Sequence, residues 1–201
     1  MKSISGEEFK IILSEYQNEE DNLIKQYTID NGLFKGTNIK AKRFDTCIFS
    51  KCRFNRCNFS KSEFNACIFT DCVFDGCYCQ SSAFYKCTFL FTSFFMCFME
   101  KSEYNQSSFT NCEIKACRLI DAKFSQCHFI SYFRFINANL TNVIFTACTR
   151  FKDEDKTSEI FGLNVNFKNM QIRSCNFNLL VEIDPRVIEI IKRMKGGNNV
   201  T

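Results

Sequence analysis

Cysteine is the residue with the most obvious chemical potential in this sequence, since the chain of 201 residues contains fourteen of them. Thiolates bind zinc, form disulfides and act as nucleophiles. Zinc sites use short cysteine pairs separated by longer gaps, whereas most cysteines here recur at intervals of five residues or multiples of five. Such a series does not gather four thiolates at one point. We therefore expect no metal and no cofactor, but free and buried thiols.

Catalysis has no other candidate residues. His128 is the only histidine, and no motif places a nucleophile or an acid beside it. A glycine-rich phosphate loop is also missing from the sequence. We expect no catalytic residues and a protein that is not an enzyme.

The cysteines belong to a repeat of five residues. From Phe34 to Phe129 a bulky apolar residue, usually phenylalanine, occupies every fifth position, which we call the centre. The position two before each centre holds a small residue, often cysteine, with Lys42 as the exception, and Cys79 is the one cysteine at a centre. A period of five matches neither a helix nor a strand, so the backbone must turn once per repeat with both positions inward.

Four repeats are predicted to close one turn of the chain. When every fourth repeat is grouped, the residues two before the centre sort by identity. One group lacks cysteine and another is nearly all cysteine: Lys42, Ser62, Ser82, Ser102 and Ala122 against Cys47, Cys67, Cys87, Ser107 and Cys127. This sorting predicts a coil of twenty residues with four faces.

Runs such as CIFSKCRFNRCNFSKSEF (residues 47–64) resemble the pentapeptide repeat family. The usual motif of that family has alanine two before a central leucine or phenylalanine, and here cysteine largely replaces the alanine as a small buried residue. The resemblance covers about residues 32–179. It implies an all-β solenoid, a right-handed quadrilateral β-helix with strands so short that they resemble turns.

Both ends of the chain are predicted to be helical. Ser5 and Glu8 form a capping box before an amphipathic helix over residues 6–17, part of an N-terminal segment 1–31. This helix would cover the first coil, and the alternative is a helix that binds a partner. Asp184 and Pro185 start a second helix in the C-terminal segment 180–201. Its apolar face either covers the last coil or pairs with a second subunit, as C-terminal elements of the family do, and it includes Val187, Ile191 and Met194.

The repeat is interrupted twice. One residue is added between Phe129 and Phe135, which a bulge or a corner loop would accommodate. After Cys148 the pattern stops, and it resumes at Phe167. We expect residues 151–164 to form a loop that protrudes from one continuous β-helix, so that the chain is one structural domain.

Charge is distributed unevenly along the coil, although the net charge is only +4. Acidic residues prevail from Glu63 to Glu113, and basic residues prevail before them. A basic patch is a candidate for nucleic-acid binding, but charges wrapped around four faces are more often a solvated surface, so nucleic acid is not the expected partner. This candidate patch comprises Lys51, Arg53, Arg56 and Lys61.

An apolar run, TFLFTSFFMCFM at residues 88–99, interrupts the polar exterior. With Phe89, Phe94 and Met99 at centres, five side chains should point outward: Leu90, Phe91, Phe95, Met96 and Phe98. Folded monomers rarely leave such a patch bare. We expect a partner protein or a second copy of the chain to cover it, and the alternative is coverage by helix 6–17 or loop 151–164.

The expected function is a non-enzymatic binding scaffold. The start of the chain lacks an apolar run, which favours a cytoplasmic protein without a membrane segment. Acidic members of the family resemble DNA, bind DNA gyrase or topoisomerase IV and protect them from quinolones, so the resemblance implies a type II topoisomerase as partner, although this chain departs from them in the sign of its charge. The alternatives are a protein-binding scaffold or host-directed effector that uses the apolar patch, and a direct nucleic-acid binder.

Overall fold

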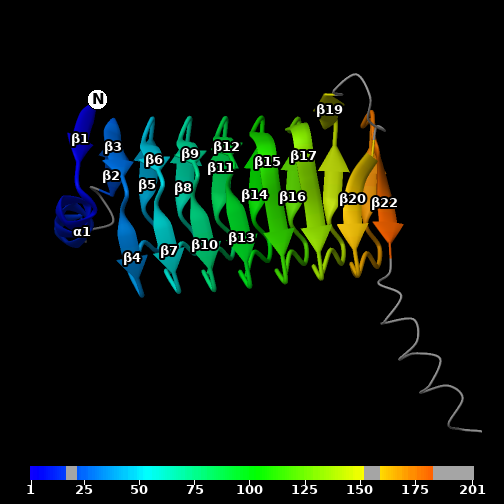
Figure 1. Cartoon of the computed structure of the whole chain (residues 1–201), viewed down its shortest axis with the longest axis horizontal. Coiled ribbons are helices and arrows are strands. Elements are labelled where there is room, and N and C mark those ends of the chain that lie inside the picture. The colour runs from blue at the N-terminus through cyan, green and yellow to red at the C-terminus, as the bar shows by residue number, and fades with distance from the viewer. Residues whose placement is uncertain (17–21, 152–158, 183–201) are drawn as a thin grey trace, which may run out of the picture.

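The computed structural model describes residues 1–16, 22–151 and 159–182. Over these residues the chain winds into a stack of coils, in which strands of successive coils pair in parallel (Figure 1). The predicted all-β solenoid with four faces is confirmed. We number the faces in the order in which the chain passes through each coil.

Face 1 is an eight-stranded parallel sheet within the described residues. Its strands are only three residues long, as the repeat length requires, and they follow in chain order: β2 (Leu23–Lys25), β5 (Arg43–Asp45), β8 (Glu63–Asn65), β11 (Ala83–Tyr85), β14 (Glu103–Asn105), β16 (Lys123–Ser125), β18 (Ile144–Thr146) and β21 (Gln171–Arg173).

Faces 2 and 3 are joined into one sheet because two strands run through the corner between them, namely β15 (Ser108–Lys115) and β17 (His128–Ile136). Face 2 also contains β1 (Lys2–Ile4), β3 (Tyr27–Asp30), β6 (Ile48–Ser50), β9 (Ile68–Thr70), β12 (Thr88–Leu90) and β19 (Thr149–Phe151). Face 3 also contains β4 (Leu33–Lys35), β7 (Arg53–Asn55), β10 (Val73–Asp75), β13 (Ser93–Phe95), β20 (Glu159–Leu163) and β22 (Asn178–Glu182).

Face 4 is held by isolated parallel bridges between successive coils, which link Asn38, Asn58, Tyr78, Phe98, Arg118, Asn139 and Asn166. The register on every face confirms the coil of twenty residues over most of the stack. Phe74, for example, pairs with Phe54 in the coil before and with Phe94 in the coil after.

The corners of the coil use a left-handed backbone at the residue two after the centre. Lys51 and Arg56 both have φ of 52°, and the same sign recurs at almost every corner. This conformation costs about 1–2 kcal/mol for a residue other than glycine. The corner residues also form backbone hydrogen bonds to the next coil: the Lys51 N–H donates to the Thr70 carbonyl at 2.8 Å.

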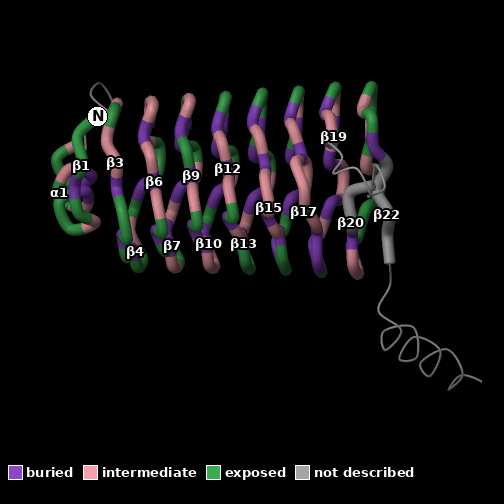
Figure 2. Tube along the Cα trace, turned by 45° about the horizontal axis from the view of Figure 1, so that its top comes forward, coloured by how far each residue is buried: buried purple, intermediate pink, exposed green. Residues whose placement is uncertain are grey.

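The interior is a stack of aromatic rings. Buried residues recur along every rung of the stack (Figure 2). The Phe69 ring lies 5.0 Å from Phe49 and 5.1 Å from Phe89, nearly parallel to both. The small residues beside the rings satisfy buried carbonyls, since the Cys72 thiol donates to the Phe49 oxygen at 3.3 Å and the Ser62 hydroxyl donates to the Ile39 oxygen at 2.6 Å.

The predicted N-terminal helix is present as α1 (Gly6–Glu15), which ends before the expected limit at residue 17. Its capping box is confirmed, because Ser5 accepts from the Glu8 N–H at 3.2 Å and Glu8 accepts from the Ser5 N–H at 2.7 Å. Phe9 is fully buried, and its ring lies 5.7 Å from Phe34. Among the described residues, no helix is long and apolar enough to cross a membrane.

The coil begins about ten residues before the first centre that the repeat revealed. Ile24 and Ile29 occupy buried centres and pair with Phe44 and Phe49 of the next coil. The pattern hid them because the slots two before them hold a large residue, Tyr27, and a polar one, Asn22. These slots lie at the end of the stack, where the described chain before them forms no complete coil and β1 pairs Lys2 with Tyr27.

The C-terminal interruptions differ from expectation in part. The added residue before Phe135 forms a bulge in β17, as predicted. The loop expected over 151–164 was wrong for its later part, because β20 already pairs with β17 from Phe161 onward. Arg150 and Gly162 occupy the positions opposite Phe129 and Phe135, so the apolar signal vanishes although the backbone pairing continues.

The end of the described chain also departs from expectation. Phe167, predicted to point inward, is half exposed, since no later coil of the described chain lies over face 4 there. Residues 178–182 form β22, where the C-terminal segment was expected to begin. The predicted C-terminal helix, with Val187, Ile191 and Met194, lies outside the described residues.

Replacing Phe89 by alanine should lower the free energy of unfolding by about 3–5 kcal/mol, because the ring is fully buried between Phe69 and Phe109. Phe91→Ala should change it by less than about 0.5 kcal/mol, because that ring is exposed. Denaturant titration followed by circular dichroism measures both. Equal losses would contradict the inward and outward assignments.

The thiols generate a second prediction. Every cysteine is buried except Cys175, which is half-buried. Burial raises the pKa of the Cys112 thiol to about 12 and that of Cys79 well above its ordinary value, so both are protonated and unreactive at neutral pH. A native-state reaction with a thiol reagent should therefore label one site quickly, and Cys175→Ser should remove that fast phase.

The pH dependence of this labelling has a definite sign. Burial also raises the pKa of Cys175, so its thiolate fraction, and with it the labelling rate, should increase as the pH rises above neutrality. Rapid reaction of many thiols in the folded protein would contradict the buried positions.

Candidate protein-binding surface

The predicted apolar residues are exposed at the middle of the stack. Phe91, Phe95 and Met96 are 55%, 38% and 54% exposed. Phe95 lies on β13 of face 3, and the other two occupy the corners on either side of that face. We call these three residues the face 3 patch.

The geometry of the repeat explains why these side chains point outward. Phe94, the centre of this repeat, and Thr92, two before it, fill the interior and are both buried. Phe91 and Met96 have φ of 49° and 52°, the left-handed corner conformation. The Phe91 and Met96 side chains therefore cannot turn into the core, and the coil does not bury them.

Leu90 and Phe98, the other two predicted residues, are only half-buried and lie on different faces. Leu90 ends β12 on face 2, and Phe98 bridges to neighbouring coils on face 4. The five residues thus form a band around three faces of one coil. Only the face 3 patch offers a single surface to a partner.

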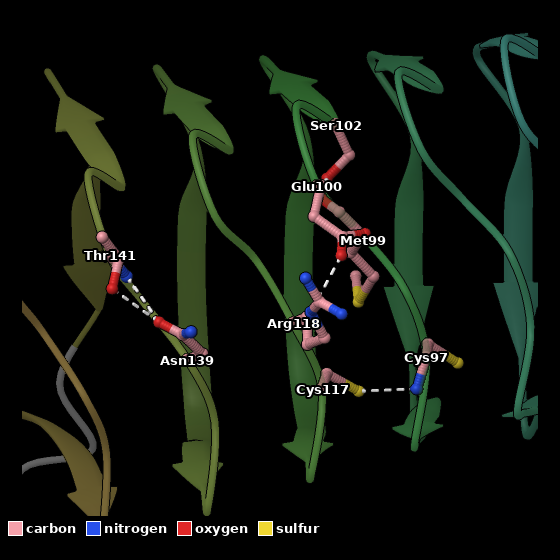
Figure 3. Close-up of polar contacts among 8 residues, drawn as sticks. All are labelled: Cys97, Met99, Glu100, Ser102, Cys117, Arg118, Asn139 and Thr141. Carbon is pink, nitrogen blue, oxygen red and sulfur yellow. Dashed lines mark hydrogen bonds and ion pairs between the residues drawn. The ribbon is translucent and has the colours of Figure 1, made fainter.

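Phe98 is engaged within the protein itself. Its ring stacks on Tyr78 at 5.1 Å, and the Arg118 guanidinium lies 5.8 Å from its centroid. Arg118 in turn pairs with Glu100 at 3.0 Å (Figure 3). This stack stabilises face 4 and leaves Phe98 less available than Phe91 or Phe95.

Charged residues border the face 3 patch. Asp75 lies beside Phe95 in the coil before, and Lys115 lies beside it in the coil after, with its amine 5.9 Å from the ring. Asp71 occupies the same corner as Phe91 in the preceding coil. An apolar centre with a charged rim is the usual anatomy of a protein interface. The rim was not predicted, although the coil of twenty residues would have revealed it, since Asp75 and Lys115 lie twenty residues before and after Phe95.

Neither the N-terminal helix nor the described chain at the C-terminal end covers this patch. α1 lies at one end of the stack, whereas β12 and β13 lie near its middle (Figure 1). The expected alternative of coverage by helix 6–17 is therefore wrong. The central part of the expected loop, residues 152–158, lies outside the described residues.

The candidate basic residues are not all brought together. Arg53 lies on face 3, and Lys51 and Arg56 occupy the corners beside it. Lys61 occupies the corner between faces 4 and 1, away from the other three. Three of the four thus border face 3, two coils before the apolar patch.

The acidic residues of the middle coils are largely neutralised by neighbours one coil away. Four carboxylates form ion pairs across coils, at N–O distances of 2.6–3.4 Å: Glu63 with Arg43, Glu100 with Arg118, Glu103 with Lys123 and Glu113 with Arg134. Along each of these faces an acidic side chain lies next to a basic one in the neighbouring coil, so the surface of the described residues has no continuous negative stripe.

No cluster of metal-binding side chains occurs among the described residues. His128 is half-buried, and its Nδ1 lies 2.6 Å from the Thr149 hydroxyl. The pairing of β17 with β19 brings these two residues together, which the sequence pattern did not reveal.

Comparison with known proteins matches part of the chain to a family model. Residues 47–124 match the model of the pentapeptide repeat region. No curated protein sequence matches the chain. Among solved structures, full-length QnrB1, described as a plasmid-mediated fluoroquinolone resistance protein, is 13% identical with a TM-score of 0.43 and covers 96% of this chain and 97% of its own.

HetL, a pentapeptide repeat protein involved in heterocyst differentiation regulation from the cyanobacterium Nostoc sp. strain PCC 7120, is also similar. It is 7% identical with a TM-score of 0.43, and the match covers 87% of this chain and 94% of HetL. The matched repeat region, the coil of twenty residues and the inward pairs of small residue and phenylalanine agree. Residues 47–124 are therefore a pentapeptide repeat region by sequence, and the coil continues on both sides of it with the same parallel pairing.

Proposed function

We propose that this protein is a non-enzymatic scaffold that binds another protein through the face 3 patch. The observation that carries the proposal is the exposure of Phe91, Phe95 and Met96 on one side of an otherwise polar coil. Each phenylalanine that a partner buries fully contributes about 1.5–3 kcal/mol. Aromatic anchors of this kind dominate the binding energy of many interfaces.

The rigidity of the stack favours binding by this surface. The backbone of β13 pairs with β10 before it and with β15 after it. The patch is therefore held in place before a partner arrives, and association loses little backbone entropy. Asp75 and Lys115 on either side of Phe95 would orient the partner through charge.

A type II topoisomerase is the partner that we propose to test first. Support comes from the family and from the fluoroquinolone resistance named for QnrB1. The ion pairs across coils mean that recognition would rest on shape and on the apolar patch more than on a DNA-like negative surface. We place the protein in the cytoplasm, where thiols stay reduced.

The double substitution Phe91→Ser and Phe95→Ser should abolish partner binding without unfolding the stack, because both rings are outside the core. Tyr85→Ser is the matched control, since Tyr85 is 40% exposed in the same coil but on face 1. Light scattering and circular dichroism of all three proteins should show folded monomers. A wild-type dimer that the double substitution converts into a monomer would instead assign the patch to self-association.

Gyrase supercoiling assays test the choice of partner. The wild-type protein and Tyr85→Ser should restore supercoiling in the presence of a quinolone, and the double variant should not, because it lacks the apolar anchors. Absence of any effect of the wild-type protein, with and without quinolone, would contradict a role in topoisomerase protection.

A further inference from the structure

Lys42 is the one charged residue that lies two before a centre in the described chain. The same slot in the coils that follow holds small residues, all buried: Ser62, Ser82, Ser102 and Ala122. Lys42 is half-buried. A lysine at this position brings a positive charge next to the first coil, where the following coils have neutral residues.

The Lys42 side chain lines a cleft between α1 and the first coil. The cleft has a volume of about 470 Å³ and is lined by Lys10, Leu13 and Ser14 from the helix and by Thr37, Asn38, Lys40 and Lys42 from the coil. Three lysines thus line one cleft, and none of the described residues that line it is acidic. Three like charges around one cleft repel each other and create a positive potential that attracts anions.

The amines and neutral donors of the cleft are available to a ligand. Lys10 pairs at 2.6 Å with Glu7, but this carboxylate is exposed and such pairs contribute little. Lys40 and Lys42 form no ion pair with any described residue. The Asn38 side-chain oxygen accepts from the Lys40 N–H at 3.2 Å, which leaves the amide nitrogen of Asn38 as a donor.

We propose that this cleft binds a phosphate group. Lysine amines are compact point charges that suit the several oxygens of phosphate, and Asn38 and Thr37 add neutral donors. The volume admits a small organic group beside the phosphate, with Leu13 as an apolar wall. Inorganic phosphate and small phosphate monoesters share this chemistry. The site is distinct from the face 3 patch, so failure of either proposal leaves the other intact.

Isothermal titration of the full chain with inorganic phosphate and with glycerol 3-phosphate, at constant ionic strength in chloride, tests the site. The wild-type protein should bind at one saturable site. Lys42→Ser should weaken binding about tenfold or more, since a charge-assisted bond is lost. The variant should fold, because serine occupies this slot in the next coil. Lys51→Ser, at an exposed corner outside the cleft, should bind like the wild type.

Thermal unfolding supplies an independent readout. Phosphate should raise the melting temperature of the wild-type protein and of Lys51→Ser but not that of Lys42→Ser. Tighter binding of glycerol 3-phosphate would identify a monoester as the ligand, and equal binding would identify phosphate itself. No saturable binding to either, or equal weakening by Lys42→Ser and Lys51→Ser, would overturn the proposal.

The chain's own acidic residues provide the sharpest competing explanation. Glu19, Glu20 and Asp21 follow α1 in the sequence. If the wild-type protein does not bind phosphate but the variant Glu19→Gln, Glu20→Gln, Asp21→Asn does, the cleft is occupied by these carboxylates, and the proposal of an external ligand fails. Similar binding by both proteins supports it.

Discussion

The structure depends on a turn of the backbone at every fifth residue. The corner residues take a left-handed conformation that costs free energy at each step, and few of them are glycine. Stacked phenylalanine rings about 5 Å apart and parallel hydrogen bonds between coils offset this cost. Because each coil contacts mainly its neighbours, stability accumulates along the stack as in other repeat proteins.

The regular turn arranges the outward side chains in rows, one row for each position of the coil. Residues one coil apart become neighbours, so ion pairs such as Glu103 with Lys123 form between positions twenty residues apart. The core demands only the centre and the slot two before it, so the remaining positions are free to vary. The face 3 patch arises where one coil uses apolar residues at three of these free positions.

Most departures from the repeat lie at the two ends of the stack, where a coil has a neighbouring coil on one side only. At the N-terminal end, α1 packs Phe9 against the first rings and leaves a basic cleft beside Lys42. At the other end, Arg150 and Gly162 replace apolar centres and Phe167 is half exposed. Arg150 and Phe167 lie on the last described rung of their faces, whereas Gly162 is paired on both sides, with Phe135 and Val181.

Sequence periodicity alone determined the coil of twenty residues, the inward pairs and the outward direction of Phe91 and Phe95, and a local motif determined the capping box of Ser5 and Glu8. Periodicity suffices because, in a parallel stack, the position of a residue within its repeat of five decides whether its side chain points inward or outward. The tertiary structure decided the rest: the start at Ile24, the strand at 159–163 and the contact of His128 with Thr149. These features depend on contacts between coils and on the ends of the stack, where backbone pairing continues although the apolar pattern has ceased.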